Sequence, residues 1–255
     1  HFLCVVVGSG SLSDTVKFAT FKDGRKYASF ATAGSMNGYG AGTASVTLSN
    51  GYKTSVSAQA PRAVFVDLSV SAAAPPWLAA AGLGDSLCRP TAQVEWWAAH
   101  RLFGTPFAQT PFDLFNVEDD EALMIKTAPH YKAHSIEANG YLYRVLTLAS
   151  FGNNIVGSSH SGSMGEHQVS HWIDMFAGEA HPGTTHGQQV GVASIALARL
   201  HQYLLSFDKP PKIKPTKIGK TDFAKRYGES IGQMMYGEAI RKSFDVDGAA
   251  VLNRR

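Results

Sequence analysis

The sequence is poor in cysteine, in net charge and in long apolar runs. Its two cysteines, Cys4 and Cys88, form no CxxC pair and are too few for a disulfide framework, which favours a reducing, cytoplasmic setting. No apolar run is long enough to span a membrane. The formal net charge of +3 predicts no nucleic-acid partner, although it suits an anionic small-molecule substrate. The 255 residues are enough for two structural units.

Short apolar runs dominate the first third of the chain. Residues 2–7 (FLCVVV) predict a fully buried strand of a parallel sheet, and residues 26–32 (KYASFAT) and 63–66 (AVFV) predict two further strands. Residues 45–57 hold Asn-Gly between two alternating segments, which predicts a β-hairpin.

Glycine-rich loops follow the first two predicted strands. Residues 8–10 (GSG) precede residues 11–21, which have helical spacing with Ser11 or Ser13 as the expected cap. A strand, glycine turn and helix let backbone N–H groups approach a phosphate. The third glycine of the usual dinucleotide fingerprint is missing, however, so the segment equally fits a plain turn. Residues 33–40 form a second loop, expected at the same carboxyl edge of the sheet.

The composition changes at Pro75-Pro76, after which helical runs replace strands. We therefore predict an α/β domain over residues 1–76 and a helical domain over residues 77–255, with a cleft between them. Trp96 and Trp97 are expected in the core, and the lysine- and proline-rich residues 209–220 in an exposed linker. The chain starts within a predicted strand and stops without a helix end, so we expect it to be truncated at both ends.

Four of the ten histidines lie within residues 165–192. His167 and His171 stand four apart and share one face of a predicted helix. His186 follows a Gly/Pro/Thr loop and begins an apolar run, so imidazoles from two elements can meet at one divalent metal ion. An HxxxH pair also fits a polar helix face with no metal. His181, in the loop, is expected at the surface.

Six segments share the order of one known family. They are GSGSLSDTVKFATF, TAGSMNGYG, PRAVFVDL, AAGLGDSLCRPTA, GEHQVSHWIDM and THGQQVGV. Together they resemble the sn-glycerol-1-phosphate dehydrogenases, of the iron-containing alcohol dehydrogenase, glycerol dehydrogenase and dehydroquinate synthase superfamily. The resemblance implies a dehydroquinate synthase-like fold of class α/β plus all-α. A partial Rossmann-like domain would bind the nucleotide, and the helical domain would bind metal and substrate.

The resemblance also implies a metal held by Asp85, His167 and His186, which is a catalytic arrangement with an open fourth position. Zn²⁺ is the expected ion, and Fe²⁺ or Ni²⁺ suits the same ligands. His171 would either contact substrate or orient a ligand. Asn37 replaces a family aspartate near the substrate and keeps its size but not its charge. This change would reduce catalysis, alter substrate preference or matter little.

A third implication is a set of residues that bind NAD or NADP. They are Gly8, Ser9, Gly10, Asp14, Thr32 and Ser35. Asp14, close to Lys17 at the end of the first motif, would contact the cofactor or fix the loop. Thr32 would line the nicotinamide side, although its hydroxyl equally suits a bond to local backbone.

The implied reaction is a metal-dependent NAD(P)-linked interconversion of dihydroxyacetone phosphate and sn-glycerol 1-phosphate. The metal would polarise the ketone and reduced nicotinamide would transfer hydride. Lys53 and Arg89 are candidates for binding the substrate phosphate, and both also fit solvated surface charges. The alternatives are a glycerol dehydrogenase, a dehydroquinate synthase-like enzyme acting on another polyol or sugar phosphate, or a catalytically impaired ligand-binding homologue. A homo-oligomer is also possible.

Overall fold

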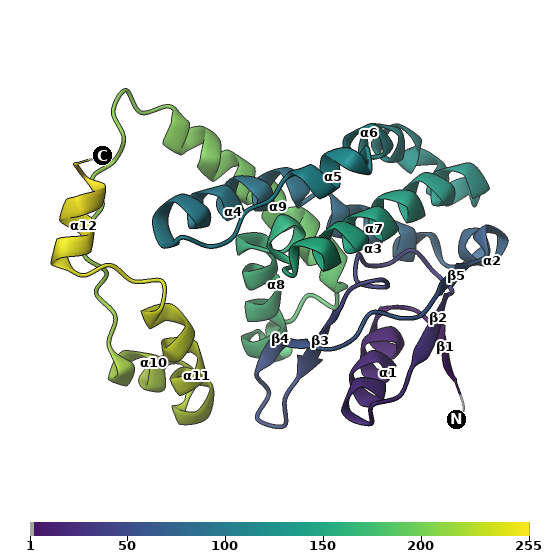
Figure 1. The fold of residues 1–255 in the computed structure, drawn as a ribbon, viewed down its shortest axis with the longest axis horizontal. Coiled ribbons are helices and arrows are strands. Elements are labelled where there is room, and N and C mark those ends of the chain that lie inside the picture. The colour runs from purple at the N-terminus through teal and green to yellow at the C-terminus, as the bar shows by residue number, and fades with distance from the viewer. Residues whose placement is uncertain (1–2, 255) are drawn as a thin grey trace.

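A small parallel sheet lies beside a larger group of helices in the computed structural model, which describes residues 3–254 (Figure 1). The strands are β1 (Cys4–Gly8), β2 (Tyr27–Ala31) and β5 (Val64–Val66), and β2 is the middle strand. Gly8 pairs with Ala31, and Ala31 with Val66, so the carboxyl ends of all three strands share one edge. The three predicted strands are confirmed, except that Phe2 lies outside the described residues. The expected full burial of the first strand is wrong, because Val5 and Val7 are 54% and 62% exposed and only one face of β1 is covered.

Helix α1 (Gly10–Lys22) follows β1 almost at once, and its N-cap is Ser9, whose backbone is still extended. The prediction of a cap at Ser11 or Ser13 is therefore wrong: the helix begins inside the glycine turn, and Ser13 is buried within it. Because Gly10 is the first helical residue, the turn and the helix N-terminus are one structure.

The predicted hairpin is confirmed as β3 (Thr43–Thr47) and β4 (Lys53–Ser57), which pair antiparallel. Gly51 at its tip has a φ of 84°, a left-handed conformation that glycine adopts without strain. The Asn50 side-chain oxygen accepts a hydrogen bond from the Tyr52 N–H at 3.1 Å, which closes the turn.

The chain after β5 is helical, as predicted. Its α-helices are α2 (Leu68–Ala73), α3 (Pro76–Ser86), α4 (Arg89–Phe103), α5 (Thr110–Leu114), α6 (Val117–Thr127), α7 (Ile136–Val156), α8 (Gly165–Phe176), α9 (His186–Leu205), α10 (Lys220–Tyr227), α11 (Glu229–Ile240) and α12 (Val246–Leu252). Short 3-10 helices are η1 (Ala128–Ala133), η2 (His160–Gly162) and η3 (Gly178–Ala180). None of the described helices is long and apolar enough to cross a membrane.

The main apolar core lies among helices α3, α6 and α7, where Met124 and Leu142 are fully buried. Tyr143 of α7 belongs to a second cluster that joins this helical layer to β2 through Ala31. Helices α10, α11 and α12 lie at the far side from the sheet (Figure 1). The division at residue 76, where α3 begins, stays a prediction.

Two expectations about the helical part have different outcomes. Trp96 is fully buried, as predicted, but Trp97 is 53% exposed, so placing it in the core is wrong. Consecutive helical residues point about 100° apart, and only one of this pair faces inward. Residues 209–219 form neither helix nor strand and are largely exposed, which agrees with the predicted exposed segment.

Candidate metal centre

Helices α3 and α9 pack backbone to backbone because both carry glycines at their contact. A Cβ atom on Gly84 would lie 2.2 Å from the carbonyl oxygen of Gly187. A Cβ atom on Gly187 would lie 2.0 Å from the carbonyl oxygen of Ala81. No larger side chain fits without moving a backbone. Asp85 and His186 each follow or precede one of these glycines, so the close approach brings them together.

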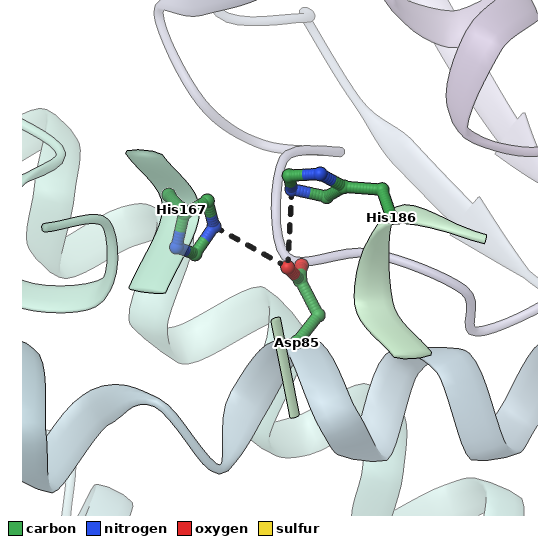
Figure 2. Close-up of side chains that lie close together, drawn as sticks. All are labelled: Asp85, His167 and His186. Carbon is green, nitrogen blue, oxygen red and sulfur yellow. Dashed lines mark ion pairs between the residues drawn. The ribbon is translucent and has the colours of Figure 1, made fainter. Parts of the chain in front are cut away.

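Three side chains from three helices converge at this contact (Figure 2). Asp85 Oδ1 of α3 lies 3.4 Å from His167 Nε2 of α8 and 3.6 Å from His186 Nε2 of α9. The ligand atoms of all three lie within 4.8 Å of one another. Residues separated by about a hundred positions in sequence thus present one carboxylate oxygen and two ring nitrogens to a single point.

The Asp85 carboxylate is buried and only partly satisfied. Its Oδ2 accepts a hydrogen bond from the Asn37 backbone N–H at 2.8 Å. Its Oδ1 has no hydrogen-bond partner among the described residues. A buried acceptor without a partner is costly, and a cation placed between Oδ1 and the two imidazoles would satisfy it.

The two imidazoles are oriented as metal ligands usually are. His167 Nδ1 lies 2.8 Å from Glu166 Oε1, and His186 Nδ1 lies 2.8 Å from Ser170 Oγ. With both Nδ1 atoms engaged, the Nε2 lone pairs are free to face Asp85. One carboxylate and two imidazoles form a ligand set that suits Zn²⁺, Fe²⁺ or Ni²⁺. The residues present therefore fit a divalent cation.

Charge at the centre favours a cation there. Burial alone would raise the pKa of Asp85, but the nearby imidazoles of His167 and His186 outweigh burial and lower it. Burial alone would lower the pKa of His167, but the side chains of Asp85, Cys88 and Glu166 raise it well above its usual value. Positive charge is thus stabilised between Asp85 and Glu166. Burial lowers the pKa of His186 to about 4, so its ring is neutral near pH 7.

His171 and Asn37 both lie beside the three candidate ligands. The ring centroids of His171 and His186 are 5.8 Å apart, and burial lowers the pKa of His171 to about 3. The Asn37 side chain lines a small hollow together with Asp85, in addition to the backbone bond to that carboxylate. The roles of both residues in substrate binding stay predictions.

The two glycine-rich loops meet at the carboxyl edge of the sheet. The hydroxyl groups of Ser9 and Ser35 are hydrogen-bonded to each other. A Cβ atom on Gly10 would lie 3.3 Å from the Met36 side chain. The Thr32 N–H donates to the Gly8 carbonyl at 3.2 Å. The structure therefore gathers five of the six predicted cofactor residues in one place.

Asp14, the sixth, faces the hairpin. Its carboxylate accepts hydrogen bonds from Lys17 Nζ at 2.9 Å and from the Ser45 N–H at 3.0 Å. Lys17 is fully buried, and its ammonium also donates to the carbonyls of Gly38 and Thr43 at 2.7 and 2.9 Å. These bonds tie α1 to the second loop and to β3. They favour the alternative in which Asp14 fixes the loop.

The remaining charged candidates have protein partners. Arg89 is buried, and its guanidinium binds both oxygens of the Glu121 carboxylate, so a solvated charge is wrong for this residue. Lys53 forms an ion pair with Asp174, and His181 Nε2 lies 3.1 Å from that same carboxylate. The His181 side chain is 31% exposed, which agrees with its expected place at the surface.

Glu166, Ser170 and Gln189 were not among the residues predicted from the sequence. All three are buried against the metal-binding candidates. The available signal was position: Glu166 directly precedes His167, and Ser170 stands one helical turn after Glu166. Gln189 reaches Ser170 from another helix, which no spacing in the sequence indicates.

Comparisons with known proteins agree with the motifs. Residues 2–75 match the iron-containing alcohol dehydrogenase family. A glycerol-1-phosphate dehydrogenase [NAD(P)+] from Methanoculleus marisnigri is 34% identical over 196 residues, which cover 76% of this chain and 52% of the relative. One from Bacillus subtilis is 30% identical over 220 residues, covering 84% and 54%. The chain thus spans about half the length of the curated relatives it matches.

Solved structures share the fold. A probable glycerol dehydrogenase from Sinorhizobium meliloti superposes with a TM-score of 0.65 at 18% identity, over 99% of this chain and 76% of that one. An iron-containing alcohol dehydrogenase from Thermotoga maritima gives 0.55 at 14% identity, over 89% and 68%. The predicted fold class and the predicted resemblance are confirmed.

Proposed function

We propose that this chain, which resembles the glycerol-1-phosphate dehydrogenases, belongs to a metal-dependent NAD(P)-linked oxidoreductase that interconverts dihydroxyacetone phosphate and sn-glycerol 1-phosphate. The observation that carries the proposal is the convergence of Asp85 Oδ1 with the Nε2 atoms of His167 and His186, at 3.4 and 3.6 Å. The similarity to glycerol-1-phosphate dehydrogenases [NAD(P)+] supports the substrate and the NAD(P) cofactor. Zn²⁺ is the ion that we expect, because two imidazoles and a carboxylate with an open position form a catalytic zinc arrangement, and Fe²⁺ or Ni²⁺ suits the same ligands.

Asp85, His167 and His186 would hold the ion, while the meeting loops would receive the cofactor. A bound divalent ion supplies Lewis-acid polarisation of the ketone, and bound NAD(P)H supplies the hydride. The chain itself contributes placement and charge. The Asn37 N–H holds Asp85 Oδ2, which leaves Oδ1 facing the imidazoles. Near pH 7 His171 is neutral and would contact substrate as a hydrogen-bonding group without added charge.

The proposal is tested by mixing purified protein with Zn²⁺, NADH or NADPH, and dihydroxyacetone phosphate, and following loss of reduced nicotinamide by absorbance. We expect turnover that requires the ion and is lost in Asp85→Asn, which keeps the size of the side chain but not its charge. Unphosphorylated dihydroxyacetone serves as the matched substrate control.

Three other outcomes contradict the proposal in different ways. Preference for the unphosphorylated ketone would indicate a glycerol dehydrogenase. Binding of Zn²⁺ without turnover of either ketone would indicate a ligand-binding homologue. Turnover that is unchanged in Asp85→Asn would remove the assigned metal site altogether.

A further inference from the structure

We propose that Glu166 and Ser170, one turn apart on α8, are positioning residues that set both metal-binding imidazoles through their Nδ1 atoms. This inference deepens the proposed function and rests on its cation site. It assigns α8 two tasks: to provide one ligand, His167, and to orient a second ligand, His186, that α9 provides.

The first half of this arrangement lies at the start of α8. Glu166 is fully buried, and its Oε1 accepts from His167 Nδ1 and from the Met164 N–H, both at 2.8 Å. Glu166 Oε2 has no hydrogen-bond partner in the part of the chain that the structure describes. A buried carboxylate with so few local partners is costly unless a nearby cation balances it. Asp85 and Glu166 together carry the two negative charges that match one divalent ion.

The second half joins α8 to α9. The Ser170 hydroxyl is fully buried and lies 2.6 Å from Gln189 Oε1 and 2.8 Å from His186 Nδ1. Because the amide oxygen can only accept, Ser170 gives its single proton to Gln189. The hydroxyl oxygen must then accept from His186 Nδ1–H. This direction leaves His186 Nε2 with its lone pair facing Asp85.

The direction of the Gln189 amide is fixed in turn. Its Nε2 donates to Asp174 Oδ1 at 3.2 Å and to the Thr184 carbonyl at 3.3 Å. The amide oxygen therefore points to Ser170. Acceptors on the far nitrogen of a metal-binding imidazole fix its tautomer and raise its basicity, and losing one weakens metal binding about 10- to 100-fold.

The test measures Zn²⁺ affinity by competition with a chromophoric chelator, without any substrate. For Glu166→Ala and Ser170→Ala we expect a dissociation constant about 10- to 100-fold higher than that of the parent protein. Glu166→Gln keeps an acceptor for Nδ1 but loses the charge, so its loss should be smaller than that of Glu166→Ala. Gln168→Ala, exposed on the same helix, is the matched control and should bind as the parent does.

A second readout separates orientation from loss of structure. In the Co²⁺-loaded protein, the Nδ1 protons of the ligating imidazoles give exchangeable, paramagnetically shifted NMR signals. We expect two such signals, and faster solvent exchange of only one of them in Ser170→Ala. Far-UV circular dichroism of the apo variants checks the fold, and Glu166→Gln is the conservative variant if Glu166→Ala does not fold.

The inference is overturned if Ser170→Ala and a folded Glu166→Ala bind Zn²⁺ as the parent does while Asp85→Asn loses binding. It is also overturned if neither proton signal changes its exchange rate in Ser170→Ala. If Asp85→Asn itself leaves the affinity unchanged, the cation site of the proposed function fails instead, so the two failures are distinguishable.

Discussion

Asn37 is the residue whose exchange best tests the charge of the centre. Its side chain lines the hollow beside Asp85, where a second carboxylate would add attraction for a cation. We expect Asn37→Asp to bind Zn²⁺ about tenfold more tightly, which corresponds to about 1.4 kcal/mol. Chelator competition measures this, and turnover should rise with it if the proposed reaction is correct.

The matched control is Asn37→Ser, which keeps a small polar side chain without charge. The backbone N–H that holds Asp85 is retained in both variants. The parent asparagine matches aspartate in size, so the difference between Asn37→Asp and the parent reports the charge, and Asn37→Ser shows the effect of the smaller side chain. If Asn37→Asp and Asn37→Ser bind Zn²⁺ with equal affinity, a negative charge at position 37 does not strengthen Zn²⁺ binding.

Acid should destabilise the metal-free protein. The pKa values of His171 and His186 are about 3 and about 4 when folded, because burial disfavours their charged forms, against about 6.5 in the unfolded chain. Between those values the unfolded chain binds more protons, so stability falls as pH falls below about 6.5. The raised pKa of His167 acts oppositely: its contribution persists in acid and is lost as pH rises through that value.

Urea unfolding of the parent and of His171→Gln at about pH 7 and about pH 5 measures this effect. The parent should lose more free energy of unfolding between the two pH values, since the variant lacks one of the two buried neutral imidazoles. Identical losses would show that His171 is not held neutral by the fold.

The sequence pointed to these residues unevenly. Asp85, His167 and His186 could be predicted as metal ligands, because they lie in motifs that follow the order of a known family and because their side chains are of types that bind metals. The orientation of the His186 ring could not be predicted, since it depends on Ser170 of α8 meeting Gln189 of α9. The ion pair of Arg89, predicted either to bind phosphate or to be a solvated charge, was missed for the same reason, because its partner Glu121 lies 32 residues away.

At the scale of elements, the contact of α3 with α9 controls the site. Gly187→Ala would place a methyl carbon only 2.0 Å from the Ala81 carbonyl oxygen, so the two backbones would have to move apart. Forcing apart two packed backbones costs about 1–3 kcal/mol or more of unfolding free energy. We also expect weaker Zn²⁺ binding, because the neighbouring His186 would move away from Asp85. Urea unfolding and chelator competition measure the two effects.

Gly237→Ala in α11 is the control for the glycine exchange. A Cβ atom there would meet nothing within 4 Å, so this change should stabilise the protein by about 0.5–1 kcal/mol through helix propensity. If Gly187→Ala behaved like Gly237→Ala, the helices would not be held at the distance that the structure shows.

Elements with a local cause were predictable. The β-branched run of β1 and the Asn-Gly turn between β3 and β4 follow from neighbouring residues alone. The start of α1 was predicted too late, because the N-cap is Ser9, directly after the strand, and it lies two residues before Ser11, the nearer of the two predicted caps. The close packing of α3 and α9 could not be predicted, because the sequence does not show which glycines face each other.

At the scale of the molecule, the ion should act as a cross-link among three helices. A ligand that binds only the folded state stabilises it by about 2.7 kcal/mol at a free concentration one hundred times its dissociation constant. For a chain of this size that corresponds to a rise in melting temperature of about 5–10 °C. Differential scanning calorimetry with and without Zn²⁺ measures the rise.

The same scan of Asp85→Asn is the control, and its melting temperature should not respond to Zn²⁺. An equal rise in both proteins would place the stabilising ion elsewhere. No rise in the parent, together with measurable binding, would mean that the unfolded chain binds the ion about as well as the folded chain does.

The three candidate ligands are unequally covered, and this unequal cover sets an order of events. The side chains of Asp85 and His167 are 2% and 7% exposed, whereas that of His186 is 32% exposed. The centre is most accessible beside His186, so we expect the ion and the ketone to approach from that side. A ketone bound there would cover the ion, and we therefore expect the ion to bind before the ketone and to leave after it.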